Sequence, residues 1–102
     1  MKTLLVLKNI EKKFIIIHYF KNEKDALNQW NCWPCYLDWE IVYLKERKKT
    51  GHRYELEYAK FDENGELYSW YIICFSKREA LILKDKIREV NPNYMFNIKK
   101  LY

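Results

Sequence analysis

Glycine and proline are scarce in this chain of 102 residues, with two of each. Such a composition leaves little room for long flexible loops or low-complexity tails. No window approaches the ~20 apolar residues of a membrane-spanning helix. The apolar run at residues 4–7 is shorter than the roughly 7–15 residues of a signal peptide. We therefore expect a single domain, residues 1–102, located in the cytoplasm.

Cysteine is also sparse, and three cysteines do not make a disulfide framework. Cys32-Trp33-Pro34-Cys35 resembles the thioredoxin redox motif, although there the motif follows a central strand and here it follows a short predicted helix. A zinc site through Cys32 and Cys35 would lack a second closely spaced pair. Its further ligands would have to come from Cys74, His18 and His52. We expect these cysteines to pack beneath a loop, and we expect no metal and no cofactor.

The usual signs of catalysis are missing. His18 and His52 are the only histidines. The sequence has no nucleophile with a placed base, no G-x-S-x-G segment and no phosphate-binding glycine loop. We therefore expect a protein that is not an enzyme.

Three runs of alternating bulky residues, 39–47, 53–61 and 67–75, predict β-strands. Asn64-Gly65 between the last two runs is a strong hairpin signal, because a type I′ turn needs positive φ at both central residues. Thr50-Gly51 marks a looser turn between the first two. Together these runs predict a central three-stranded antiparallel meander.

Two helices and further strands surround the predicted meander. A short helix, about 23–31, follows the N-cap Asn22, and a longer helix to about residue 90 follows the capping box of Ser76 and Glu79. Residues 3–7, 13–20 and 94–100 read as strands. The predicted fold is α+β, with a mostly antiparallel sheet of four to six strands and two helices on one face. The expected core is Ile15, Ile17, Leu27, Trp30, Ile73, Phe75, Ala80, Leu83, Ile87 and Phe96.

The two helix starts share a pattern of cap, two polar residues, acid, alanine and leucine. The first pattern begins at Asn22 and the second at Ser76, 54 positions later. Good helix starts resemble one another in general, because capping and first-turn acids are common to many helices. The alternative is a chain made of two similar strand-helix-strand halves.

The formal charge of +5 favours an acidic partner, such as nucleic acid, a nucleotide or an acidic protein surface. The positive residues cluster between the first two runs of the predicted meander, and the following turn, 62–66, is acidic. The basic segment could bind a partner or a phosphate, or it could be a solvated loop. Its candidate binding residues are Arg47, Lys48, Lys49, His52 and Arg53.

Aromatic residues are numerous in the predicted strands, and two helices can cover only one face of a sheet. We expect the other face to expose rings that bind a protein, stack with bases or join two copies as a homodimer. The candidate residues of this aromatic interaction face are Tyr43, Tyr54, Tyr58, Tyr68, Trp70 and Tyr71.

The last third of the chain, from Ser76-Lys77-Arg78-Glu79-Ala80-Leu81 through Asn91-Pro92-Asn93-Tyr94, resembles small accessory proteins of phages and mobile elements of AT-rich bacteria. Several such proteins inhibit host defence, including anti-CRISPR proteins. The resemblance implies a viral inhibitor in the host cytoplasm that binds a host protein or a nucleoprotein defence complex, with no membrane partner. The alternative is a nucleic-acid- or nucleotide-binding module that uses the basic segment and exposed aromatic rings.

Overall fold

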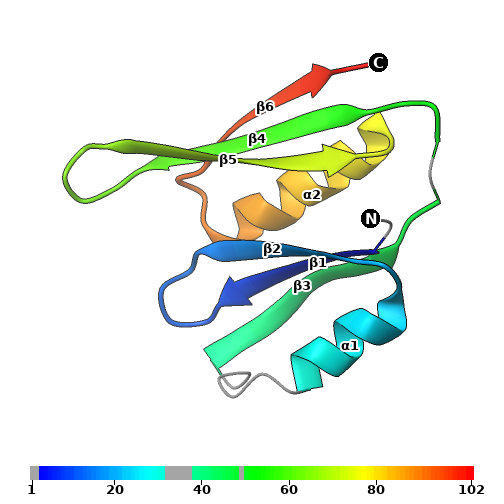
Figure 1. Cartoon of the computed structure of the whole chain (residues 1–102). Helices are drawn as coiled ribbons and strands as arrows, with labels where there is room; N and C mark the ends of the chain where they lie inside the picture. The colour runs from blue at the N-terminus through cyan, green and yellow to red at the C-terminus, as the bar shows by residue number, and fades with distance from the viewer. Residues whose placement is uncertain (1–2, 32–37, 49) are drawn as a thin grey trace. The chain divides into compact units, whose positions relative to one another are not determined.

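Six strands and two helices follow one another in the order β1, β2, α1, β3, β4, β5, α2, β6 (Figure 1). The computed structural model describes residues 3–31, 38–48 and 50–102. The chain divides into two compact units, Met1–Lys49 and Thr50–Tyr102. Each unit contains one three-stranded antiparallel sheet and one helix. The predicted α+β class with antiparallel strands is confirmed.

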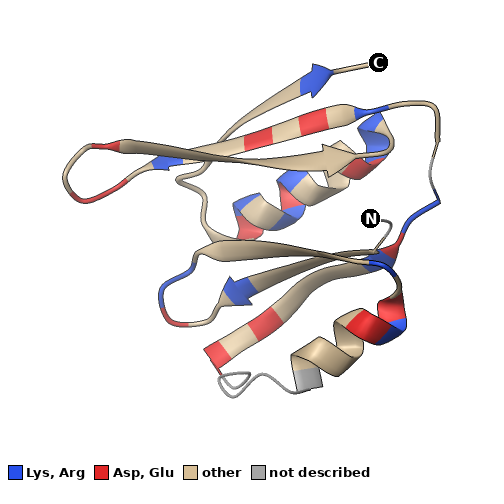
Figure 2. Ribbon diagram, in the orientation of Figure 1, with Lys and Arg blue, Asp and Glu red and all other residues tan. Residues whose placement is uncertain are grey.

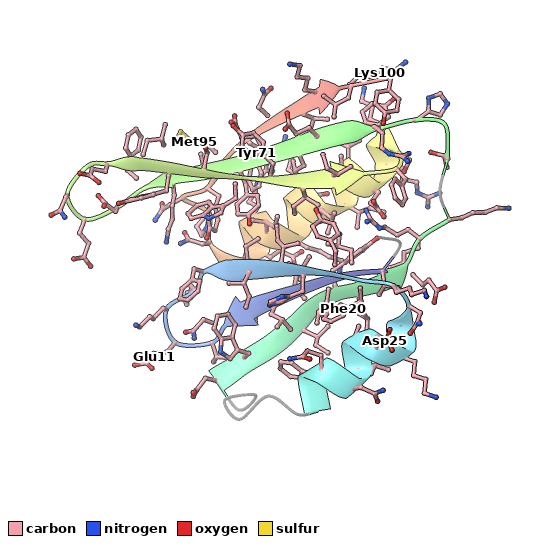
Figure 3. The ribbon with its side chains drawn as sticks, in the orientation of Figure 1. Glu11, Phe20, Asp25, Tyr71, Met95 and Lys100 are labelled. Atoms are coloured by element: carbon pink, nitrogen blue, oxygen red, sulfur yellow. The ribbon has the colours of Figure 1, made fainter. Side chains whose placement is uncertain are left out.

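The first unit is built around its most apolar strand. The order of its sheet is β2-β1-β3, so β1 is central, and Leu4, Val6 and Leu7 are fully buried. A bulge between Val6 and Leu7 shifts the register against β3. Phe20 points from the sheet toward α1 (Figure 3). The elements are β1 (Thr3–Asn9), β2 (Ile15–Phe20), α1 (Glu23–Asn31) and β3 (Trp39–Glu46).

The second unit places its helix on one face of the sheet β5-β4-β6. Leu56 of β4 lies opposite Ile72 and Ile98, and paired residues of an antiparallel sheet share a face. Leu56 and Ile72 are fully buried, as is Leu83 of the helix, so this face packs on α2. The elements are β4 (Tyr54–Phe61), β5 (Leu67–Cys74), α2 (Lys77–Val90) and β6 (Met95–Lys100).

The two units share one topology. Each runs strand, strand, helix, strand, and in each the first strand is central. Each helix begins at a polar cap: the backbone N–H of Asp25 donates to Asn22 Oδ1 (2.8 Å), and that of Glu79 donates to Ser76 Oγ (3.1 Å). The repeated helix-start pattern in the sequence therefore marks equivalent positions of two similar halves.

The pairing of β3 corrects the prediction of a central meander. β3 pairs with β1, whereas β4 pairs with β5 and β6. β3 and β4 are therefore not the two strands of a hairpin, as the sequence predicts. The sheets also correct the prediction of two helices on one face, because each sheet carries its own helix. Strand alternation identifies a strand but not its partner.

The predicted core residues agree best with the structure in α2. Ala80, Leu83 and Ile87 are fully buried, and Ile15 of β2 is buried as well. Leu27 is 38% exposed, so its assignment to the core was wrong. Only Ala26 of the short α1 is fully buried among the described residues, because a nine-residue helix presents few positions to a sheet. Among the described residues, neither helix has the length and apolar character needed to cross a lipid bilayer.

Candidate functional site

Four aromatic rings cluster at the β4–β5 hairpin, three from its strands and one, Tyr94, from the segment between α2 and β6. Tyr58 and Trp70 stack with centroids 5.4 Å apart and planes at 18°. Tyr68 lies 6.4 Å from Trp70 at 27°, and Tyr94 meets Tyr58 edge to face at 5.6 Å. Aromatic pairs in these geometries each contribute about 0.5–1.5 kcal/mol beyond the area that they bury. We call Tyr58, Tyr68, Trp70 and Tyr94 the aromatic platform.

The aromatic platform has a buried base and an exposed surface. Tyr58 is 1% exposed and Tyr94 is 5% exposed, whereas Trp70 is 40% exposed and Tyr68 is 47% exposed. The buried rings fix the orientation of the exposed rings. A ring that is already held in place loses little conformational entropy when a partner covers it.

Strand register and turn chemistry bring the rings together. Tyr58 lies directly opposite Trp70, and Tyr68 is two residues before Trp70 on the same face of β5. The turn between the strands is held by Asp62, whose Oδ1 accepts from the backbone N–H groups of Asn64 and Glu66, both at 2.8 Å. Gly65 has the predicted positive φ, 81°, but Asn64 does not, so the predicted type I′ turn was wrong. The backbone N–H of Asp62 donates to the carbonyl of Glu66, and that of Gly65 to the carbonyl of Asp62, which closes a longer loop.

Carboxylates surround the exposed end of the aromatic platform. The phenol of Tyr68 donates to Glu66 Oε2 at 3.0 Å. This hydrogen bond, together with the negative charge of Asp62, raises the pKa of Tyr68 above its ordinary value. Figure 2 shows the acidic residues of this turn in red on the two sides of the hairpin tip. Lys60 lies against the other edge of the cluster, with Nζ 5.5 Å from the centre of the Tyr94 ring.

The six predicted aromatic residues do not share one face. Tyr58, Tyr68 and Trp70 belong to the platform, and Tyr54 lies on the same face of β4, opposite Cys74. Tyr71 lies on the opposite face, and Tyr43 belongs to the first unit, where it pairs with Val6. The sequence analysis did not identify Tyr94 as part of an aromatic site. It assigned Tyr94 only as the first residue of the last predicted strand.

A second group of exposed apolar residues lies on the other face of the same sheet. Tyr71 and Met95 are 51% and 46% exposed, and both lie on the face away from α2 (Figure 3). Phe61 and Leu67 form a cross-strand pair beside the turn and are 59% and 55% exposed. Among the described residues, Phe61 and Tyr71 make no ring stacking of the kind that holds the platform together.

The predicted basic segment is divided between the two units. Arg47, in the first unit, is only 4% exposed, and its guanidinium carbon lies 5.9 Å from the centre of the Tyr19 ring. Lys48 is exposed, and Lys49 lies outside the described residues. Because Arg47 is buried, its guanidinium is not available to a partner, as the charge of an exposed loop residue would be.

In the second unit, His52 is exposed and Arg53 holds the local chain together. Its Nη1 donates to the carbonyl oxygens of Thr50 and His52, both at 2.8 Å. The same guanidinium lies 4.5 Å from the centre of the Phe75 ring. The backbone N–H of Arg53 donates to the carbonyl of Tyr102 at 2.8 Å, which fixes the C-terminus beside β4.

The candidate ligands for metal or redox chemistry are dispersed. Cys74 is buried, with its Sγ 3.9 Å from the carbonyl oxygen of Ile72, whereas His18 and His52 are exposed and belong to different units. Cys32 and Cys35 lie outside the described residues. In the described part of the chain, no three His, Cys, Asp or Glu side chains are grouped as metal ligands would be.

Comparison of the chain with protein-family models, with curated proteins and with solved structures found no match. The aromatic platform and the charges around it are therefore the features from which a function can be proposed.

Proposed function

We propose that the chain is a non-enzymatic binding protein that holds a partner protein on the aromatic platform. The observation that carries this proposal is the exposure of Tyr68 and Trp70 above the buried rings of Tyr58 and Tyr94. Tyr and Trp are the residues most enriched at the energetic centres of protein interfaces. Rings held by stacking are pre-organised for such a contact.

The charges near the aromatic platform favour a protein over a nucleic acid. Asp62, Glu63 and Glu66 lie in the turn beside Tyr68, and the hydroxyl of Tyr68 is bonded to Glu66. Nucleic-acid sites that stack bases on aromatic rings also provide cations for the phosphates. Carboxylates would repel a phosphate backbone, but they would attract a Lys or Arg side chain on a protein.

The resemblance to phage accessory proteins suggests which partner to test first. We take it to be a host protein, or the protein surface of a nucleoprotein defence complex. The alternative of a nucleic-acid partner would rely on the basic segment. Arg47 is buried and Arg53 bonds to its own chain, so Lys48 and His52 are the described residues of that segment with exposed side chains.

The test is capture of partners from a host-cell lysate on the immobilised full chain. A variant that combines Tyr68→Ser and Trp70→Ser removes the exposed rings, and Phe61→Ser removes a still more exposed ring from the opposite face of the same hairpin. We expect the double variant to lose the partner and Phe61→Ser to retain it. Far-UV circular dichroism checks that both variants fold.

A gel-shift assay with mixed DNA and RNA tests the alternative. Nucleic-acid binding should weaken steeply with salt because neutralised phosphates release counterions. It should also weaken with Lys48→Glu, which changes an exposed charge without disturbing a buried residue. Binding of this kind, unaffected by loss of the two rings, would contradict the proposal.

A further inference from the structure

The edge strand β5 has none of the features that normally protect an edge from pairing. Within the described residues it pairs with β4 alone, and Leu67, Tyr68, Ser69, Trp70 and Tyr71 are all exposed. Lysines, prolines and bulges usually protect such edges. The other edge strand, β6, carries two lysines, whereas β5 has no charged residue along its length.

We propose that β5 pairs with β5 of a second copy of this chain, antiparallel, about a two-fold axis at Ser69. In that register Leu67 faces Tyr71 of the other copy, and Tyr68 faces Trp70. Aromatic cross-strand pairs stabilise such a ladder, and no like charges meet across it. Ser69, the smallest side chain on this part of the strand, lies at the axis, where two identical residues face each other.

The charges at the two ends of β5 support a second copy as the occupant. The turn before the strand carries Asp62, Glu63 and Glu66, and helix α2 begins just after it with Lys77 and Arg78 (Figure 2). Antiparallel pairing brings the acidic turn of each copy alongside the basic end of the other. The arrangement therefore places unlike charges together twice, which favours the two-fold register over parallel pairing.

The dimer would join two sheets into one and align the Tyr68 and Trp70 rings of both copies in a single row. This inference depends on the edge of β5 and stands independently of the proposed partner.

The test is the molar mass in solution, measured by light scattering at tens of micromolar. We expect twice the chain mass of 12.7 kDa. Ser69→Lys and Ser69→Glu each place like charges across the axis, and each should weaken the dimer about tenfold or more. Mixing the two variants should restore the dimer, because opposite charges then meet at the axis.

The control is Asn97→Lys, which adds a charge to an exposed residue of the other edge strand. It should leave the dimer unchanged. Because Ser69 is exposed, its variants should fold, and circular dichroism checks this. A monomeric wild-type chain would overturn the inference. So would a dimer that tolerates either Ser69 variant alone, or a mixture that fails to restore it.

Discussion

The turn between β4 and β5 allows a sharp test of the backbone geometry. Gly65 has φ of 81°, and a Cβ added there would meet no atom within 4 Å. The substitution Gly65→Ala should therefore cost only conformational energy. The left-handed region costs a residue with a Cβ about 1–2 kcal/mol. Alanine regains about 0.4–1 kcal/mol by restricting the unfolded chain, so we expect a net loss of about 1 kcal/mol.

Gly51 is the matched control for this substitution. A Cβ added there also meets nothing within 4 Å, but its φ lies outside the left-handed region. Gly51→Ala should therefore stabilise the chain by about 0.4–1 kcal/mol through the unfolded state. Both variants replace a glycine by alanine. Gly65→Ala should lower the free energy of unfolding and Gly51→Ala should raise it.

The equivalent turn of the first unit provides the reciprocal change. Lys13 has φ of 54° and is the only described residue other than glycine with positive φ. Lys13→Gly should remove the conformational energy that a residue with a Cβ has in the left-handed region, but it should also raise the entropy of the unfolded chain. We expect the difference to stabilise the folded chain by about 0.5–1 kcal/mol. Lys12→Gly, one residue earlier, should instead destabilise it.

Urea denaturation of the full chain measures all four variants. With a slope of about 1–3 kcal/mol per molar urea, a change of 1 kcal/mol moves the midpoint by roughly 0.3–1 M. The reasoning would be refuted if Gly65→Ala were as stable as Gly51→Ala, or if Lys13→Gly lowered the midpoint.

Four further substitutions test the packing and the charges. Leu83→Ala in the buried face of α2 should lower the free energy of unfolding by about 2–5 kcal/mol, whereas Leu81→Ala at a 43%-exposed position of the same helix should change it by no more than about 0.5 kcal/mol. Thr3→Val should raise it by about 1 kcal/mol, because Thr3 Oγ1 is buried with no hydrogen-bond partner among the described residues; a loss of stability would show that the hydroxyl is satisfied. Glu66→Gln should return the pKa of Tyr68 toward 10.0, measured by tyrosinate absorbance. Because that pKa is raised, the stabilisation by Tyr68 is present below about pH 10 and is lost as the pH rises through the raised pKa.

Local features of the fold could be predicted from the sequence. The caps at Asn22 and Ser76 and the Asn64-Gly65 turn depend on side chains that bond or orient the adjacent backbone, so a few residues suffice to identify them. The buried stripe of α2 follows from helical periodicity. These signals identified both helices and the positions of the strands.

The partners of the strands could not be predicted in the same way. Residues 39–46 and 54–61 alternate as adjacent strands of a meander would, yet they pair with β1 and with β5 and β6. Pairing depends on which distant strand offers a complementary face, and alternation carries no information on this. The repeated pattern at the helix starts was the sequence signal for two similar halves.

The candidate site was predictable in its residue types but not in its arrangement. Three of the six predicted aromatic residues cluster on the hairpin, because the register of β4 and β5 follows from the turn between them. Tyr94 joins them from beyond α2, a long-range contact that no local pattern indicates. The burial of Arg47 could not be predicted either, because a run of positively charged residues is typical of a solvated loop.

Photo-crosslinking tests the proposed docking surface most directly. A photoreactive benzoylphenylalanine replaces Tyr68 in one variant and Phe61 in another, and each full chain is irradiated in the cell lysate used for partner capture. We predict a discrete protein adduct from position 68 and none from position 61. An adduct between two copies is recognised by a mass of twice 12.7 kDa. Equal adducts from both positions, or an adduct from position 68 that nuclease removes, would contradict a protein partner on the aromatic platform.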